Sequence, residues 1–267
     1  MQTKSIKVQC PAKINLNLKV INKRDDGFHN IESVMQTISL YDYLSISVDD
    51  SEKLEIFLDG NNKEIPYNEK NLVYKAGMLF CEICKISNKK ISVYIDKNIP
   101  VSAGLAGGST DAAGMLYGLN KLFDEVLAEQ DLHKLCAQLG SDLNFCLVGG
   151  CMKTSGRGEI LEPCDFKPSK VNLIKPRDLG ISAKEAYTKF SQKMALNSAG
   201  RDKYKNDLEW AVIDDYKKLQ FIKEKYPTSM MTGSGSTYFS LDKEFEQSEG
   251  YWINNGLLFV NNGISQV

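Results

Sequence analysis

Residues 99–113 read Ile99-Pro-Val-Ser-Ala-Gly-Leu-Ala-Gly-Gly-Ser-Thr-Asp-Ala-Ala113. They follow a strand-like run at 91–95 and lead into an amphipathic pattern that predicts a helix from about Ser109. Glycine and other small residues let a backbone approach a ligand closely. A helix start adds unpaired N–H groups and the positive end of the helix dipole. The stretch therefore predicts a phosphate-binding loop, with a tight strand-to-helix turn as the alternative.

This loop differs from two common phosphate-binding motifs. A Walker loop needs a Gly-Lys pair, and none follows the stretch. The Gly-x-Gly-x-x-Gly spacing of a dinucleotide-binding fold is also missing. The pattern thus indicates a nucleotide site of another class.

Composition excludes several classes of protein. The 267 residues carry a net charge of −1 and are 42% hydrophobic, which suits one large or two modest domains and argues against a nucleic-acid partner. No apolar run is long enough to span a bilayer, and the N-terminus lacks the apolar region of a signal peptide. We therefore expect a cytoplasmic protein that does not bind membranes.

The seven cysteines favour reduced thiols. Their odd number does not suit a disulfide framework. Cys81-x-x-Cys84 raises a redox or zinc alternative, but it falls on an apparent helix whose apolar spacing already explains the burial of one thiol. No second Cys-x-x-Cys is present to complete a zinc site.

Local patterns predict an α+β protein, because strands and helices alternate along the chain. Residues 13–20 alternate between apolar and polar side chains, as a half-buried strand does. Gly140 marks a helix end, and Ser182 with Glu185 has the spacing of a capping box. The other predicted strands cover 43–48, 53–58, 91–96, 171–174, 229–232, 236–241 and 257–260, and the helices cover 70–86, 110–123, 130–139, 206–213 and 215–225.

Two charged residues suit phosphoryl transfer, which requires positioning and charge neutralisation more than covalent work by the protein. Lys13 offers a cation, and Asp142 offers a carboxylate that can orient or deprotonate a hydroxyl. Each has a plain alternative: a solvated lysine on a strand, and a turn or helix-capping aspartate after a glycine.

Several patches together carry a family resemblance. They read Pro11-Ala-Lys-Ile-Asn-Leu, Asp26-Gly-Phe-His, the loop from Pro100, Gly-Ser-Asp142, Gly-Arg-Gly-Glu159, Asn206-Asp-Leu-Glu209 and Gly233-Ser-Gly. In this order and composition the chain resembles the GHMP small-molecule kinases, from residue 11 to about residue 240. The resemblance implies an ATP-binding domain over 1–158, similar to ribosomal protein S5, and a ferredoxin-like substrate-side domain over 159–267. The last strand could return to the first domain, and the active site would lie in the cleft between the two.

The resemblance also implies an activity. It suggests that the γ-phosphate of ATP moves to the tertiary 2-hydroxyl of a methylerythritol unit linked to cytidine diphosphate, within the non-mevalonate isoprenoid pathway. Mg²⁺ is expected with ATP, and a monomer or weak homodimer is expected in solution. Two alternatives stay open at this point: a GHMP kinase acting on a smaller alcohol, and a non-catalytic sensor with the same fold.

Site residues follow from the resemblance position by position. Asp142 resembles the general base and Lys13 its cationic neighbour. Asn15 and His29 resemble substrate ligands, and Phe28 with Tyr187 would stack on cytosine, although a core role is the ordinary one for a Phe. On the ATP side the resemblance implies Asn71, Leu72, Lys97, Pro100, Val101, Ser102, Ala103, Gly104, Leu105, Ala106, Gly107, Gly108, Ser109 and Thr110.

Some positions depart from the family pattern. Ser102, Ala103 and Ala106 stand where glycine is common, and we expect negative φ at these positions and a stiffer loop. Asp111 would favour the helix dipole, yet it would repel a phosphate if it faced the site. No metal-ligand cluster is readable, and Ser109 or Thr110 is the candidate for a Mg²⁺ contact.

Overall fold

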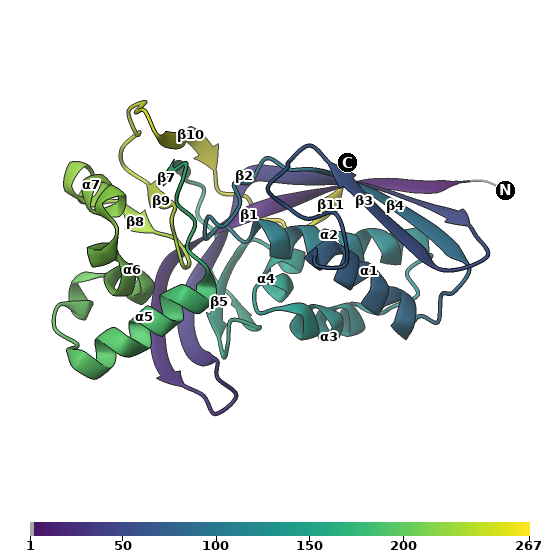
Figure 1. Ribbon diagram of the computed structural model, residues 1–267, viewed down its shortest axis with the longest axis horizontal. Helices are drawn as coiled ribbons and strands as arrows, with labels where there is room; N and C mark the ends of the chain where they lie inside the picture. The colour runs from purple at the N-terminus through teal and green to yellow at the C-terminus, as the bar shows by residue number, and fades with distance from the viewer. Residues whose placement is uncertain (1–2) are drawn as a thin grey trace.

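A long bent hairpin runs through the protein. The computed structural model describes residues 3–267, and strands β1 (Lys4–Lys23) and β2 (His29–Asp50) pair antiparallel along most of their length (Figure 1). The register shifts three times, between 11 and 12, between 15 and 17, and between 20 and 22. Such bulges bend a strand and increase its twist. The hairpin can therefore place Val8 in one hydrophobic core and Val20 in another.

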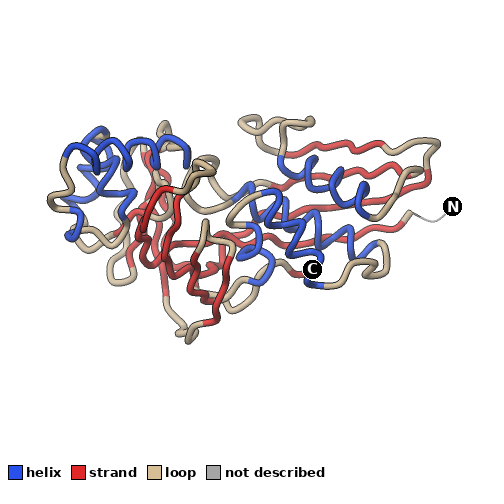
Figure 2. The backbone as a smooth tube through the Cα atoms, turned by 90° about the horizontal axis from the view of Figure 1, so that it is seen from below, coloured by secondary structure: helices blue, strands red, loops and turns tan. Residues whose placement is uncertain are grey.

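The first half of the molecule is a seven-stranded sheet in the order β11-β1-β2-β4-β3, with β5 paired to β2 and β6 to β5. Four helices pack beside it and bury its main core (Figures 1 and 2). The further strands are β3 (Glu55–Gly60), β4 (Lys89–Asp96), β5 (Cys151–Ser155), β6 (Ile160–Pro163) and β11 (Ser265–Gln266). The helices are α1 (Leu72–Ile83), α2 (Gly107–Leu122), α3 (Glu129–Leu139) and α4 (Leu143–Val148).

Helix α2 lies tightly against β1 and β2. A Cβ atom added at Gly114 would lie 2.4 Å from Cys10 Sγ, and one at Gly118 would lie 2.5 Å from Ile46 Cδ1. These two glycines therefore permit a close approach that larger residues would block. Because α2 is fixed in this way, its first turn is fixed as well, and that turn opens on the site described below.

The second half contains a four-stranded sheet in the order β10-β7-β9-β8 and a separate core. Leu18 and Ile31 of the long hairpin belong to this core, so β1 and β2 join the two halves. The strands are β7 (Lys170–Pro176), β8 (Met230–Met231), β9 (Tyr238–Ser240) and β10 (Tyr251–Leu258). The helices are α5 (Ala183–Leu196), α6 (Asp207–Val212) and α7 (Lys217–Lys225), with short 3₁₀ turns at Arg201–Lys203 and Ile213–Asp215.

The predicted α+β organisation is confirmed. The helix ends lie within a few residues of the predicted ones, but β1, β2 and β10 extend well beyond the strands predicted at 13–20, 43–48 and 257–260. The helix predicted from about Ser109 begins at Gly107, and the Ser182 hydroxyl accepts a hydrogen bond from Glu185 N, as the capping box predicted. The sequence did not predict β5, β6 and β11, which have five, four and two residues. Segments this short show no alternation that distinguishes them from loops.

The predicted division between residues 158 and 159 falls in the turn of the β5–β6 hairpin. Strand β6 still belongs to the first sheet, and β11 returns from the second half to pair with β1. The division into two domains at that point stays a prediction. Within residues 3–267, no helix has the length and apolar character needed to cross a membrane.

Candidate active site

A cavity of about 1030 Å³ lies between the two halves. Its walls come from β1, the 100–109 loop, α5 and the turn after β8, which are far apart in the sequence. Ligand cavities in proteins typically measure about 300–1,000 Å³. The predicted site residues on its walls are Lys13, Asn15, Phe28, His29, Asn71, Leu72, Lys97, Pro100, Val101, Ser102, Ala103, Gly104, Ala106, Gly107, Gly108, Ser109, Asp142 and Tyr187.

The predicted phosphate loop leads directly into α2. Ala106 is the N-cap residue, and no side chain caps this helix end. The first intrahelical bond runs from Thr110 N to Ala106 O at 2.9 Å, so the amides of the first turn have no helical partner. Gly107, Gly108 and Ser109 in that turn all line the cavity. The cavity therefore receives free N–H donors and the positive end of the helix dipole.

The expectation of negative φ in this loop is wrong at two positions. Ser102 has φ +50° and Ala106 has φ +60°, both in the left-handed region, whereas Ala103 is not in that region. A non-glycine residue pays a conformational cost there. The loop backbone is therefore held by its surroundings, including a bond from Lys13 N to Leu105 O at 3.2 Å.

Two predicted ATP-side residues do not reach the cavity. Leu105 is buried in a hydrophobic core beneath the loop. Thr110 is fully buried, and its hydroxyl has no hydrogen-bond partner. Of the two candidates for a metal contact, only Ser109 is therefore on the cavity wall.

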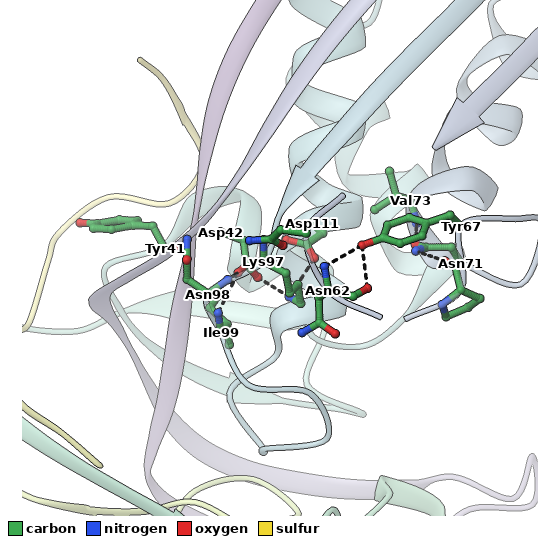
Figure 3. Close-up of polar contacts among 12 residues, drawn as sticks. Tyr41, Asp42, Asn62, Tyr67, Asn71, Val73, Lys97, Asn98, Ile99 and Asp111 are labelled. Carbon is green, nitrogen blue, oxygen red and sulfur yellow. Dashed lines mark hydrogen bonds and ion pairs between the residues drawn. The ribbon is translucent and has the colours of Figure 1, made fainter. Parts of the chain in front are cut away.

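A buried ion cluster joins the start of the loop to α2 (Figure 3). Lys97 Nζ forms ion pairs with Asp42 and, at 2.9 Å, with Asp111 Oδ2. Asp42 also accepts hydrogen bonds from Asn98 N at 2.6 Å and Ile99 N at 2.8 Å. Lys97 lines the cavity, but its ammonium group is already paired with two carboxylates, one of which is that of Asp111.

The cluster holds two carboxylates for one ammonium. Burial raises the pKa of Asp111 to about 7, opposed by Lys97 and reinforced by Asp42. In Lys97 burial acts to lower the pKa, but the two carboxylates outweigh it and raise the pKa overall. Asp111 Oδ1 is buried without a hydrogen-bond partner, so it is the oxygen available for a proton.

This arrangement predicts a pH dependence of stability. In the unfolded chain an Asp ionises near pH 4, about three units below Asp111 in the fold. The stabilising contribution is therefore complete below about pH 4 and is lost as the pH rises through about 7. Wild type should lose stability relative to Asp111→Asn between about pH 5 and about pH 8, as measured by urea unfolding. A constant difference between the two proteins over that range would contradict the assignment.

The ATP-side residues Asn71 and Leu72 mark the start of α1. The Asn71 side chain caps this helix by accepting a hydrogen bond from Val73 N at 2.9 Å, and its amide donates to Pro66 O at 2.7 Å. Figure 3 shows Asn71 and Val73 in the same close-up as the ion cluster. Asn71 is thus a helix cap on the cavity wall, with its amide already hydrogen-bonded.

The two predicted catalytic residues lie side by side. Lys13 Nζ is 3.7 Å from Asp142 Oδ2, and it donates to Asn15 Oδ1 at 2.6 Å and to Gly104 O at 3.1 Å. The Lys13 side chain is 4% exposed and that of Asp142 is 31% exposed, so the carboxylate faces the cavity. Asp142 is the N-cap residue of α4 but makes no capping hydrogen bond. Its carboxylate therefore remains available for chemistry.

Aromatic residues line another part of the cavity. His29 stacks on Tyr187 with ring centroids 4.9 Å apart and an angle of 18° between planes. Its Nε2 lies 3.0 Å from Ser191 Oγ. Burial, assisted by Lys23, lowers the pKa of His29, so the ring is neutral at pH 7. Phe28 is 50% exposed, which excludes a core role, and the Arg157 guanidinium lies 5.0 Å from its ring centroid.

Sequence reasoning assigned no role to several residues on these walls. Arg157 was quoted only as part of a motif, although it is a cation beside Phe28. Ser191 lies on α5, and the helical pattern carried no sign that its hydroxyl reaches His29. Ser141, Gly233 and Ser234 were likewise quoted only within motifs, and the cavity residues that were not singled out include Lys23, Met35, Lys184 and Gln192.

The cysteines contribute no site of their own. All seven are free, and Cys81 is buried on the apolar face of α1, as its spacing predicted. Burial raises the pKa of Cys81 to about 12, which makes its thiolate rare. Within residues 3–267, no three His, Cys, Asp or Glu side chains come together in a way that could hold a metal ion.

The fold and this site define a class of protein. Residues 71–150 match the family described as GHMP kinases N terminal domain. A crystal structure of 4-(cytidine 5'-diphospho)-2C-methyl-D-erythritol kinase superposes with a TM-score of 0.71 at 26% identity, covering 96% of this chain and 100% of that chain. A mevalonate kinase structure gives a TM-score of 0.66 at 12% identity, covering 95% and 99%. The fold is therefore that of the GHMP kinases.

Sequence relatives narrow the class. The 4-diphosphocytidyl-2-C-methyl-D-erythritol kinase of Prochlorococcus marinus (strain MIT 9515) is 35% identical over 98% of this chain and 94% of that protein. The kinase of the same name from Clostridium tetani (strain Massachusetts / E88) is 38% identical over 88% of this chain and 90% of that protein. The chain belongs to the 4-diphosphocytidyl-2-C-methyl-D-erythritol kinase family.

Proposed function

We propose that this protein transfers the γ-phosphate of ATP to the 2-hydroxyl of 4-diphosphocytidyl-2-C-methyl-D-erythritol, a step of the non-mevalonate isoprenoid pathway. The observation that carries the proposal is the Lys13–Asp142 pair, 3.7 Å apart, in a cavity that also holds the first turn of α2 and an aromatic wall. The family relatives named above carry the same activity in their names.

Asp142 is proposed as the general base. Its carboxylate faces the cavity without a capping bond, so it can accept the proton of a hydroxyl held beside it. A tertiary alcohol is a poor nucleophile, and a positioned base is typically worth about 10²–10⁴-fold in rate. Lys13 neutralises charge on the transferring group, and the free amides of the first turn of α2 hold the phosphates of ATP.

Mg²⁺ is proposed as the partner of the ATP phosphates. The residues present fit an ion of this kind, because Mg²⁺ keeps several waters and needs only one or two protein ligands besides phosphate oxygens. Ser109 supplies a hydroxyl on the cavity wall, in the first turn of α2 that receives the phosphates. Bound there, the ion would offset negative charge on the phosphates.

The aromatic wall is proposed to bind cytosine. His29 covers one face of Tyr187 and the Arg157 guanidinium lies over the Phe28 ring. Phe28 is nevertheless half-exposed, so its ring offers the stacking surface, and the Tyr187–His29 stack provides a second aromatic part of the same cavity wall. A neutral His29 has one donor and one acceptor nitrogen, which suits the polar edge of a base. A kinase for a small alcohol has no need of such a wall.

Replacing Phe28 tests the stacking role. Phe28→Ala should raise the KM for the cytidylated substrate about 5- to 150-fold, the range that 1–3 kcal/mol of base stacking gives. The KM for ATP should stay nearly unchanged, and CDP should compete with the cytidylated substrate. Phe57→Ala is a matched control, because Phe57 is also 50% exposed but lies on β3, outside the cavity. Equal KM values in the two variants would remove Phe28 from the site.

Two finer points remain proposals. Free thiols at all seven cysteines suit a reducing compartment, which supports a cytoplasmic location. A monomer or weak homodimer is proposed in solution. A non-catalytic sensor is the remaining alternative, and the presence of both Lys13 and Asp142 argues against it.

The product tests the proposed reaction. Incubation of the protein with ATP, Mg²⁺ and 4-diphosphocytidyl-2-C-methyl-D-erythritol should release one ADP per phosphate transferred. Phosphorus and carbon NMR should then place the new phosphate on the 2-hydroxyl. Phosphate on another hydroxyl, or ADP release without a phosphorylated product, would contradict the proposal.

A further inference from the structure

Thr232 lies where the second half of the protein meets the phosphate loop. It follows β8 and is fully buried. The contact between the two segments is close: a Cβ atom on Gly104 would lie 2.2 Å from Thr232 O. Thr237 N, in the same turn, donates to Ala103 O at 3.3 Å. The turn and the loop therefore hold each other in place.

The hydroxyl of Thr232 bonds to the same groups as the Lys13 ammonium. It accepts a hydrogen bond from Asn15 N at 3.0 Å. Its own proton faces Gly104 O at 3.4 Å and Asn15 Oδ1 at 3.5 Å. Lys13 Nζ donates to these two oxygens, at 3.1 Å and 2.6 Å. Thr232 thus holds Asn15 through its backbone amide and contacts both acceptors of the ammonium group, with its single proton shared between them.

A further residue fixes Thr232 itself. Asn206, the N-cap residue of α6, is buried and donates from its amide to Met231 O at 2.7 Å and to Gly233 O at 2.9 Å. These carbonyls lie directly before and after Thr232 in the chain. The core of the second half therefore sets the position of the Thr232 hydroxyl, and through it the position of Lys13.

We propose that Thr232 is a positioning residue for phosphoryl transfer, holding Asn15 and Gly104 so that the Lys13 ammonium stays beside Asp142. This inference rests on the function proposed above. Thr232 does not line the cavity, so its role concerns the alignment of reacting groups and not substrate contact. A misplacement of about 1 Å can cost about 10²-fold in rate, while binding contacts elsewhere remain intact.

Thr237 provides a matched control within the same turn. It is also fully buried, but its hydroxyl has no hydrogen-bond partner. Thr237→Val removes that hydroxyl and keeps the backbone bond to Ala103. Thr232→Val makes the same chemical change at the position where the hydroxyl is used. Comparing the two variants separates the hydrogen bonds from the loss of a buried hydroxyl as such.

Steady-state kinetics of these variants test the inference. Thr232→Val should lower kcat about 10- to 100-fold with less than about threefold change in either KM. Thr237→Val should stay within about threefold of wild type in every constant, and Thr232→Ser should recover most of the lost kcat, since it keeps the hydroxyl. A kcat for Thr232→Val equal to that of Thr237→Val would overturn the inference, as would a Thr232→Ser as slow as Thr232→Val.

Two further measurements cover a Thr232→Val protein that does not fold and a wild type that is inactive toward the cytidylated substrate. If Thr232→Val does not fold, as judged by thermal melting, Thr232→Ala removes the hydroxyl in a smaller side chain and carries the same expectation. Inactivity of wild type toward the cytidylated substrate would contradict the proposed function alone. The ratio of wild type to Thr232→Val would then be read from slow ATP hydrolysis, and a ratio of one would overturn the role of Thr232.

Discussion

Asp142→Asn should lower kcat by about 10²–10⁴-fold, because the variant keeps the shape of the side chain but cannot take the proton of the attacking hydroxyl. The side chain makes no capping bond and is 31% exposed, and the Lys13 ammonium keeps its hydrogen bonds to Asn15 and Gly104, so we expect the variant to fold. Both KM values should therefore change little. Stopped-flow or coupled measurement of ADP release gives kcat directly.

A surface carboxylate controls for charge alone. Asp131 lies on α3 with 46% of its side chain exposed and pairs with Lys134 at 2.7 Å. Asp131→Asn should leave kcat at the wild-type value. Near-normal turnover in a correctly folded Asp142→Asn protein would show that positioning and electrostatics supply the catalysis without a base.

The second large effect is expected at Lys13. Lys13→Met keeps the length of the side chain but removes the cation that stands between Asp142, Asn15 and Gly104. Loss of one preorganised electrostatic contact to a transition state typically costs about 10²–10³-fold in kcat. The loss should appear mainly in kcat, because the first turn of α2 continues to bind the ATP phosphates.

Lys19 is the control on the same strand. It pairs with buried Asp207 at 3.1 Å and does not line the cavity. Lys19→Met should lower the melting temperature through that ion pair while kcat stays within about threefold of wild type. If Lys13→Met and Lys19→Met share the same kinetic constants, the Lys13 ammonium has no catalytic role.

The long elements of this fold could be predicted from the sequence because their side-chain patterns repeat. The strand predicted at residues 13–20 lies in the second half of β1. Helices α2 and α5 begin, and α3 ends, within a few positions of the predicted residues. The bulges of β1 left no such pattern, because a register shift depends on the partner strand. Lys13 and Asn15 are buried although their strand face appeared polar, because the phosphate loop and the turn after β8 contact them there.

Single residues of the candidate site could be predicted from the sequence, whereas the contacts between distant segments that position them could not. Lys13 and Asp142 could be singled out by residue type, and the structure brings them within 3.7 Å of each other. The pairing of Lys97 with Asp42 and Asp111 joins three elements that no local pattern connects. The positive φ of Ser102 and Ala106 likewise depends on the neighbours that hold the loop.

The central claim is that the cavity recognises a cytidylated acceptor, and one comparison tests it most directly. The ratio of kcat/KM for 4-diphosphocytidyl-2-C-methyl-D-erythritol to that for free 2-C-methyl-D-erythritol isolates the cytidine diphosphate group. Stacking of the base on Phe28 alone should favour the cytidylated acceptor by about 5- to 150-fold, and the diphosphate should add to this preference. Equal kcat/KM values for the two acceptors, or a higher value for the free polyol, would contradict the account.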